Sequence, residues 1–386
     1  LFSRAYSSFT NTGDTSQFEN FKRAEAWWLD NFAFYQFLKD RFNDKPWYQW
    51  PRQYKLHDPK AMKELAGEPG IDQVKWLQFV FAGQWAALKA YCNKKDITLL
   101  GDMPFYISYD SVDVWANPQL FKIDKNGKIK GIAGVPPDYF SATGQLWGMP
   151  VYDWDRLKHS GYDWWFGRIR RNLQFFDLIR LDHFRAFSEY WEVPGGSKDA
   201  IGGSWEPAPG RDFFEKLKND LGNLPFVAED LGQIDEKVYQ LRDAFNLPGM
   251  RVLQFAFDEA MPVSEHIPHN YPVNSFAYTG THDNNTVRGW FDNDIDSKTK
   301  KRLRRYAGVK LGSDNINKVM TRMCYASVAK AAIVPLQDLL ALDESARMNT
   351  PSSIEGNWLW MMQGEMLPGK LAKYLRNLTT LCNRQC

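Results

Sequence analysis

Short apolar runs alternate with segments of helical spacing along much of this chain. A run of four to eight aliphatic or aromatic residues is typical of a strand buried on both faces, as in a parallel sheet. Helices that cover such a sheet repeat apolar residues every three or four positions. The pattern predicts a βα alternation and therefore an α/β fold. We predict six strands, at 97–104, 178–182, 226–229, 252–257, 275–279 and 331–335.

Several helices are predicted between and before these strands. An aromatic-rich helix is predicted at 24–42, and residues 297–306 form a basic helix whose charge run we interpret as a solvated surface. Two further segments, 73–91 and 163–176, have the apolar stripe of crossover helices. The stripes consist of Val74, Leu77, Phe81, Leu88 and Tyr91 in the first and of Trp165, Ile169, Leu173 and Phe176 in the second.

Three of the predicted strands end at or just before an acidic residue. Asp182 and Glu229 end their strands, and Asp283 lies just past the third. In an α/β barrel the chemistry takes place at the carboxyl ends of the strands, and acids at three separate strand ends favour a closed barrel over an open sheet. Any one of these acids alone could equally be a helix N-cap or a turn residue. Their coincidence predicts a single catalytic rim.

A complete barrel of this type has eight strands, and only six are visible. Residues 1–96 read as a helical N-terminal portion in which the first two strands are missing, and residues 97–386 carry strands three to eight. A barrel without two strands has two edges with unpaired backbone groups. We therefore expect that the chain is truncated.

An insertion at 112–161 separates the first two visible strands. It contains a loop, 134–149, with turn residues at its ends and the aromatic residues Tyr139, Phe140 and Trp147. A long irregular loop on a catalytic rim is usually functional, so we interpret it as a lid or substrate clamp. The alternative is a surface loop held in place by packing of its own rings.

Composition narrows the class of ligand. The chain has 48 basic and 46 acidic residues and a net charge of +2, so no overall field selects nucleic acid or anionic lipid. We therefore expect a neutral ligand, and we expect most of the aromatic residues, 15% of the chain, to be buried.

Other features of the sequence bear on compartment and cofactors. No apolar stretch reaches the roughly 20 residues of a membrane helix, and the first residues lack a signal-peptide pattern. Four cysteines without paired spacing predict reduced thiols, and together these features predict an intracellular protein. The histidine spacing predicts no metal site, and no glycine-rich phosphate loop points to a cofactor.

Two carboxyl groups at neighbouring strand ends suit retaining glycoside chemistry. That reaction needs a nucleophile and an acid/base roughly 5 to 5.5 Å apart. Asp182 suits the nucleophile because Arg180, two positions earlier on the same strand face, would keep its pKa low. Glu229 suits the acid/base because its apolar strand, or repulsion by Asp230, would raise its pKa. Asp283, next to His282, suits a third carboxylate that stabilises the transition state.

Taken together, these segments resemble the 4-alpha-glucanotransferases, also called amylomaltases or disproportionating enzymes, of glycoside hydrolase family 77. The resemblance implies a (β/α)8 TIM barrel of the alpha-amylase type with inserted subdomains. The segments that carry it are 101–106, the loop that begins at Gly134, and the runs 181–185, 227–232, 280–284 and 356–358.

The resemblance also implies an activity and a set of site residues. The activity is the transfer of alpha-1,4-glucan segments between maltooligosaccharide, starch or glycogen chains, with Asp182, Glu229 and Asp283 in the three roles above. Such an enzyme is a hexosyltransferase, works without a cofactor or metal, and would be found in the cytoplasm or the plastid stroma. The expected substrate-binding residues are Asp102, Tyr139, Gln145, Trp147, Arg180, His282 and Asn349.

Two alternatives stay open at this point. A hydrolase of the alpha-amylase type would use the same acids with water as the acceptor. An inactive glucan-binding fragment would follow from loss of the N-terminal strands. The aromatic loop favours transfer, because exclusion of water lets a sugar hydroxyl reach the glycosyl-enzyme intermediate first.

Overall fold

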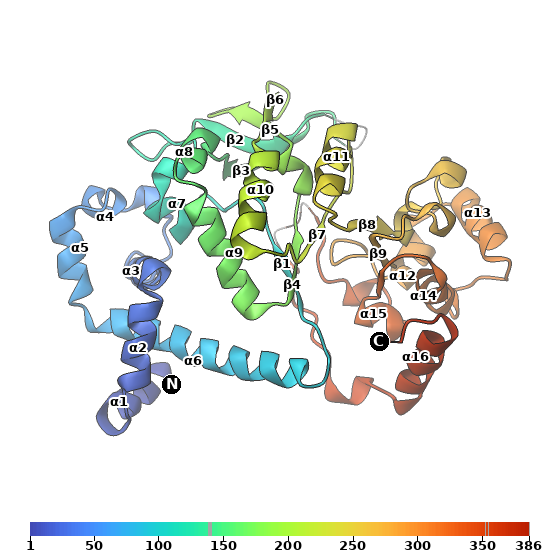
Figure 1. The fold of residues 1–386 in the computed structure, drawn as a ribbon, viewed down its shortest axis with the longest axis horizontal. Helices are drawn as coiled ribbons and strands as arrows, with labels where there is room; N and C mark the ends of the chain where they lie inside the picture. The colour runs from blue at the N-terminus through green and yellow to red at the C-terminus, as the bar shows by residue number, and fades with distance from the viewer. Residues whose placement is uncertain (138–140, 352, 354, 386) are drawn as a thin grey trace. The chain divides into compact units, whose positions relative to one another are not determined.

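The computed structural model describes residues 1–137, 141–351, 353 and 355–385 (Figure 1). The chain forms two compact units. The first comprises Leu1–Glu229 with Gln233–Leu241, and the second comprises Asp230–Gly232 with Arg242–Cys386. The boundary that we predict between residues 96 and 97, which separates the helical N-terminal portion from the strands, stays a prediction.

The first unit contains a parallel sheet whose strands run in the order β1, β4, β7. The strands are β1 (Leu100–Met103), β4 (Leu178–Leu181) and β7 (Phe226–Ala228), and each lies within a predicted run. All three residues of β7 are buried, which explains its unbroken apolar sequence. Helix α9 (Asp163–Phe175) packs on β1 and β4 and buries Trp165 and Ile169, as the stripe at 163–176 predicts.

Antiparallel pairing occupies much of the predicted insertion. Strands β2 (Gly131–Val135), β3 (Gln145–Pro150), β5 (Glu189–Pro194) and β6 (Ser204–Pro207) form a sheet in the order β3, β2, β5, β6. The prediction of an irregular loop over 134–149 was therefore wrong at both ends, where Val135 pairs with Gln145. Gly134 permits this approach, because a Cβ there would lie 2.3 Å from the Gln145 carbonyl oxygen.

The N-terminal residues 1–96 are helical, and this part of the chain, all of it described, contains no strand. Helix α6 (Pro69–Asn93) confirms the helix at 73–91, but its stripe is wrong as a buried face, since Phe81, Leu88 and Tyr91 are 46%, 48% and 62% exposed. The contact with α9 lies along this same side of the helix, where the Trp85 indole N–H donates to the Phe175 carbonyl and the Phe81 ring lies 5.9 Å from the Phe175 ring. The helices that precede α6 are α1 (Phe2–Thr12), α2 (Ser16–Ala24), α3 (Ala26–Arg41), η1 (Trp47–Gln49), α4 (Arg52–Lys55) and α5 (Pro59–Ala66).

The second unit contains a parallel sheet in the order β10, β9, β8. The strands are β8 (Gly249–Val252), β9 (Ser275–Tyr278) and β10 (Ala331–Ile333). The strand predicted at 252–257 was wrong, because residues Leu253–Phe255 form a 3-10 turn and the strand lies just before it. Arg251 interrupts the apolar pattern of the true strand and is nevertheless 4% exposed, because Asp230 pairs with it.

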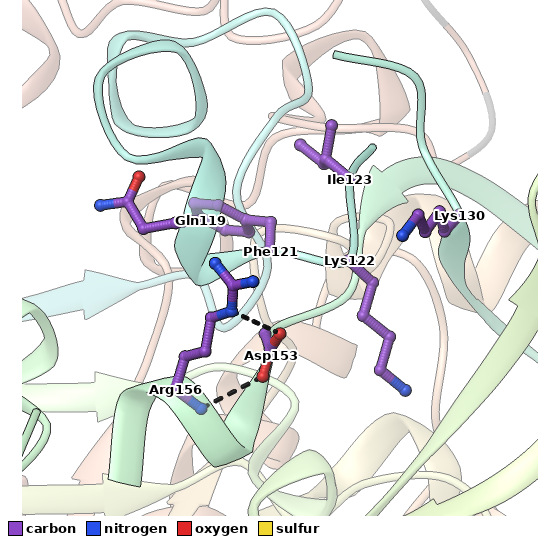
Figure 2. Close-up of a pocket in the computed structure, with 7 residues that line it drawn as sticks. All are labelled: Gln119, Phe121, Lys122, Ile123, Lys130, Asp153 and Arg156. Carbon is purple, nitrogen blue, oxygen red and sulfur yellow. Dashed lines mark hydrogen bonds and ion pairs between the residues drawn. The ribbon is translucent and has the colours of Figure 1, made fainter. Parts of the chain in front are cut away.

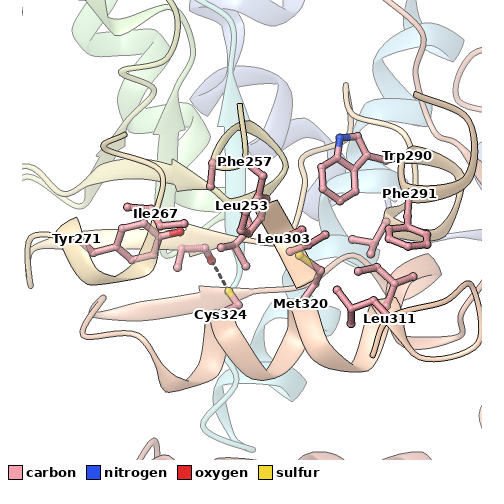
Figure 3. Packing of buried hydrophobic residues seen from close by; sticks show 14 of the residues in the cluster. Leu253, Phe257, Ile267, Tyr271, Trp290, Phe291, Leu303, Leu311, Met320 and Cys324 are labelled. Atoms are coloured by element: carbon pink, nitrogen blue, oxygen red, sulfur yellow. Dashed lines mark hydrogen bonds between the residues drawn. The ribbon is translucent and has the colours of Figure 1, made fainter. Parts of the chain in front are cut away.

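The core of the second unit lies between its sheet and its helices (Figure 3). Helix α14 (Ile316–Ala326) contributes Met320 and Cys324, and the Cys324 thiol donates to the Ala277 carbonyl of β9 at 3.3 Å. The basic helix α13 (Ser297–Ala307) buries only Leu303, in agreement with the exposed helix predicted there. The remaining labelled members are Leu253, Phe257, Ile267, Tyr271, Trp290, Phe291 and Leu311.

Shorter elements connect these sheets. In the first unit they are α7 (Val112–Ala116), η2 (Pro118–Leu120), α8 (Trp154–His159), η3 (Phe184–Phe187) and α10 (Gly210–Leu221). Helix α11 spans Glu236–Ala244. In the second unit they are η5 (Met261–Val263), η6 (Pro268–Asn270), α12 (Val287–Gly289), the π-helical η7 (Trp290–Asp294), α15 (Leu336–Leu339), η8 (Glu344–Ala346), η9 (Gly364–Met366) and α16 (Gly369–Leu381). Among the described residues, no helix has the length and apolarity needed to cross a lipid bilayer.

Candidate active site

Asp182 and Glu229 stand at the same end of two neighbouring strands. The register pairs Leu181 of β4 with Ala228 of β7, so each acid is the next residue after its strand. The ladder continues through the acids, because the Asp182 amide donates to Met103 at 3.1 Å and the Glu229 amide donates to Leu181 at 3.0 Å. Paired strands lie about 4.8 Å apart, which suits two carboxyl groups that act on one glycosidic bond.

Arg180 links Asp182 to a third acid of the first unit. Its Nη1 donates to both carboxylate oxygens of Asp102 at 2.8 Å, and its Nη2 lies 3.0 Å from Asp182 Oδ1. Burial would lower the pKa of this guanidinium, but the carboxylates of Asp102, Asp182 and Glu229 raise it above its ordinary value. A permanently charged group with a 10% exposed side chain therefore orients a nucleophile candidate whose side chain is 40% exposed.

Glu229 is held by the turn that follows Asp182. The His183 backbone N–H donates to Glu229 Oε2 at 2.8 Å. His183 has the left-handed φ of 49°, which is uncommon for a residue other than glycine and turns the chain sharply after β4. One backbone turn thus presents Asp182 and fixes one oxygen of Glu229.

The predicted loop reaches this turn through Trp147. The Trp147 ring meets the His183 ring edge-on at 5.1 Å, and its indole N–H donates to Gln145 Oε1 at 3.2 Å. Burial and the charge of Arg185 lower the pKa of His183 to about 3, so its ring is neutral. The candidates Gln145 and Trp147 therefore belong to the surroundings of Asp182, whereas Tyr139 and Phe140 lie outside the described residues.

In the second unit Asp283 forms its own cluster. Asn349 Nδ2 donates to Asp283 Oδ1 at 2.6 Å, and His282 Nε2 lies 3.4 Å from Asp283 Oδ2. Arg347 donates to the Asp283 carbonyl at 2.7 Å and to the Asn349 carbonyl at 2.8 Å. The structure thus brings together the predicted residues His282 and Asp283, which follow β9 in the chain, and Asn349.

The carboxylate geometry is matched by the similarity of the chain to known proteins. A family model described as 4-alpha-glucanotransferase matches residues 1–367. The 4-alpha-glucanotransferase of Streptococcus pneumoniae TIGR4 is 44% identical over 393 residues, which cover 100% of this chain and 76% of that protein. The chain belongs to the 4-alpha-glucanotransferases, glycoside hydrolase family 77. A chloroplastic/amyloplastic 4-alpha-glucanotransferase of Arabidopsis thaliana is 40% identical over 335 residues, which cover 86% of this chain and 58% of that protein.

A solved structure extends the comparison to the fold. The amylomaltase from Streptococcus agalactiae in complex with acarbose matches with a TM-score of 0.94 and 38% identity, over 99% of this chain and 77% of that chain. The match confirms the predicted TIM-barrel type of the family. The family model and the curated relatives confirm the enzyme class, a glycosyltransferase that transfers segments of alpha-1,4-glucan, and do not favour the hydrolase or inactive-fragment alternatives.

One residue near the site of this 4-alpha-glucanotransferase was missed by sequence reasoning. The Trp358 ring lies 5.2 Å from the His282 ring and is 61% exposed. Its backbone has a left-handed φ of 61°, and its N–H donates to the Met348 carbonyl at 2.7 Å. The signal was available, since Gly356-Asn357-Trp358 is one of the family-like segments, but nothing in the sequence pairs it with His282.

Asp230, whose repulsion of Glu229 stays a prediction, is held in place by ion pairs. It is fully buried, it pairs with Arg242 at 2.5 Å and Arg251 at 3.3 Å, and it accepts the Met250 amide at 2.7 Å. Its charge is compensated by the two arginines. Asp230 is a structural residue of the second unit.

A cavity of about 300 Å³ in the first unit contains none of the predicted site residues (Figure 2). Two of its cations are engaged locally, because Arg156 pairs with Asp153 at 3.3 Å and Lys122 pairs with Glu192. It therefore has no part in the acid chemistry described above. The lining residues are Gln119, Phe121, Lys122, Ile123, Lys130, Asp153 and Arg156.

Proposed function

We propose that this 4-alpha-glucanotransferase works by double displacement, with Asp182 as nucleophile, Glu229 as acid/base and Asp283 as transition-state stabiliser. The observation that carries the proposal is the register of β4 and β7, which makes Asp182 and Glu229 neighbours at one strand edge. The Arg180 ion pair supports the ionised form of Asp182, which a nucleophile requires.

In the first step an Asp182 oxygen attacks the anomeric carbon while the glycosidic C–O bond breaks. Glu229 gives its proton to the departing glucan oxygen, which leaves a covalent glycosyl-enzyme ester. The His183 N–H on Oε2 favours the proton on the other Glu229 oxygen, which can then face the leaving group. In the second step Glu229 removes the proton of an acceptor hydroxyl, and that oxygen displaces Asp182. Two inversions retain the alpha configuration.

Asp283 acts on the sugar ring in the transition state of each step. A carboxylate that binds ring hydroxyls more tightly as the ring flattens toward an oxocarbenium ion stabilises the transition state selectively. Asn349 holds one Asp283 oxygen by a hydrogen bond and His282 Nε2 lies 3.4 Å from the other, which limits the directions in which the carboxylate can point.

The substrate-binding residues divide by their surroundings. Gln145 and the half-buried Trp147 suit contact with sugar, and Tyr139, outside the described residues, stays a predicted contact. Arg180 already pairs with Asp102 and Asp182, so we assign to it a role in orienting Asp182 rather than in binding sugar. The exposed Trp358 ring beside His282 supplies a flat apolar face that suits stacking on a glucose unit.

We place the reaction on maltooligosaccharides and on starch or glycogen chains, in the cytoplasm or the plastid stroma. The substrate assignment is supported because the family acts on alpha-1,4-glucans. The plastid location is supported by the chloroplastic name of the Arabidopsis relative.

Trapping the intermediate tests the assignment. Glu229→Gln with alpha-maltosyl fluoride supplies a leaving group that needs no acid, while removal of the intermediate still needs the base. We expect a maltosyl ester on the Asp182 peptide in mass spectrometry, and none in an Asp182→Asn/Glu229→Gln double variant. An ester on another residue would overturn the assignment. Incubation of the unaltered chain with maltotriose checks the acceptor: longer and shorter maltooligosaccharides mean transfer, and a rise in reducing ends means hydrolysis.

A further inference from the structure

We propose that Asp338 is a positioning residue that clasps both ends of the loop carrying His282 and Asp283. The inference rests on the proposed role of Asp283. Residues 280–286 connect β9 to α12 and present the two side chains, while Asp338 comes from α15, more than 50 residues further along the chain, at sequence separations of 59 and 51 from its two partners.

The clasp consists of two hydrogen bonds to one carboxylate. The Thr279 hydroxyl donates to Asp338 Oδ2 at 2.7 Å, and the Val287 backbone N–H donates to Asp338 Oδ1 at 2.7 Å. Thr279 is the residue before the loop and Val287 is the residue after it. The distance between the loop ends is therefore set by one rigid, planar group.

The clasp is buried, and its donors are neutral. Asp338 is 1% exposed, and Thr279 and Val287 are both fully buried. Burial raises the pKa of Asp338 to about 6, although its two hydrogen bonds act in the opposite direction. A carboxylate in such a place is unfavourable for folding unless it is well bonded, so its presence is better explained by what it holds than by packing.

Neighbouring contacts make the loop and the clasp one rigid assembly. Asn317 Nδ2 on α14 donates to the Asp338 carbonyl at 2.9 Å, and Gln254 Nε2 donates to the Asn285 carbonyl at 2.8 Å. A Cβ on Gly280 would lie 2.6 Å from Gln254 Nε2 and would displace the amide that bonds to Asn285. A shift of Asp338 is consequently passed along a short, constrained segment to Asp283.

A purely structural role predicts a different outcome from a positioning role, and the Thr279 hydroxyl separates them. Thr279→Val removes one bond of the clasp with little change of shape, and Thr279→Ser keeps the hydroxyl. Leu303→Ala is the matched control, since Leu303 is fully buried in the core cluster that contains Val287 and its side chain has no polar atom. The kcat and KM for transfer from maltotriose are measured per folded molecule, at a temperature where circular dichroism shows every variant folded.

We expect Thr279→Val to lower kcat on the order of tenfold with little change in KM, because a misplaced catalytic group costs rate rather than ground-state binding. Thr279→Ser should recover most of the rate. Asp338→Asn should lower kcat as well, because its side chain keeps one acceptor oxygen and cannot accept both the Thr279 hydroxyl and the Val287 N–H. If Asp338→Asn does not fold, Thr279→Val and Thr279→Ser still distinguish a positioning role from a structural one.

Equal kcat for Thr279→Val and Leu303→Ala, at a similar loss of stability, would overturn the inference and leave Asp338 as a core residue. Asp283→Asn is measured in parallel. If Asp283→Asn keeps full transfer activity, the proposed function itself fails, and that failure is distinct from failure of the clasp.

Discussion

Arg180 Nη2 lies 3.0 Å from Asp182 Oδ1, while Nη1 of the same guanidinium holds both oxygens of Asp102. The two acids come from neighbouring strands, and a buried cation joins them at the strand ends. This geometry needs two nitrogens in a fixed plane, which a lysine ammonium cannot supply.

Arg180→Lys should therefore keep the positive charge but lose the alignment of Asp182. We expect kcat for maltotriose transfer to fall on the order of a hundredfold, since misplacement of a reacting group by about 1 Å has a cost of that size. The control is Arg185→Lys, because Arg185 is a buried arginine of the same segment that pairs with Asp235 and lies over the Trp205 ring. That variant should lose stability and keep its kcat. Similar rates for both variants would contradict the alignment role.

Asn349→Asp should replace the hydrogen bond that Asn349 donates to Asp283 with a repulsion between two carboxylates. The Asn349 amide donates to Asp283 Oδ1 at 2.6 Å, and an aspartate there has no proton to donate and brings a second negative charge. We expect a fall in kcat of about tenfold to a hundredfold, recovered in part at acidic pH, where the pair can share a proton. Steady-state rates between pH 5 and pH 8 give the comparison. Asn349→Ala loses only the bond, so its deficit should stay constant across that range.

Trp358→Ala should weaken binding more than chemistry. The exposed ring beside His282 offers a stacking face, and a contact of that kind contributes about 0.5 to 1.5 kcal/mol, which corresponds to roughly twofold to tenfold in affinity. We expect KM for maltooligosaccharides to rise by that factor with kcat little changed, and Trp358→Phe to keep most of the affinity. Leu359→Ala is the control, since Leu359 is the next residue, is 76% exposed and has no ring. A KM that does not change in Trp358→Ala would remove this residue from the site.

The sequence allowed Asp182 and Glu229 to be identified because each directly follows a short strand that is apolar in β7 and apolar apart from Arg180 in β4, and strand ends in a barrel are where reacting groups lie. The same reasoning misplaced β8, where Arg251 breaks the apolar run and is buried in ion pairs with Asp230 and Glu265, contacts between residues distant in the sequence. It also failed for the buried face of α6, which depends on the helices that pack there. The hairpin of β2 and β3, the ring of Trp358 against His282 and the clasp of Asp338 all join segments far apart in sequence or separated by turns. No local pattern contains such pairings.

His266 should make the second unit sensitive to acid. Burial and the charge of Arg251 lower the pKa of its ring from 6.5 to about 4, and its Nδ1 accepts the Val252 amide at 3.3 Å. The unfolded chain therefore binds a proton below pH 6.5 that the folded chain does not bind until about pH 4. The contribution of the neutral His266 ring to stability is fully present above the unfolded pKa and is lost as the pH falls through this window, by on the order of 3 kcal/mol.

His266→Gln keeps a hydrogen-bond acceptor without a titrating group, so its urea unfolding free energy should fall less between pH 7 and pH 4 than that of the unaltered chain. His269→Gln, at an exposed ring of the same unit, is the control for the substitution itself. Parallel curves for the unaltered chain and His266→Gln would contradict the assignment of this acid sensitivity to His266.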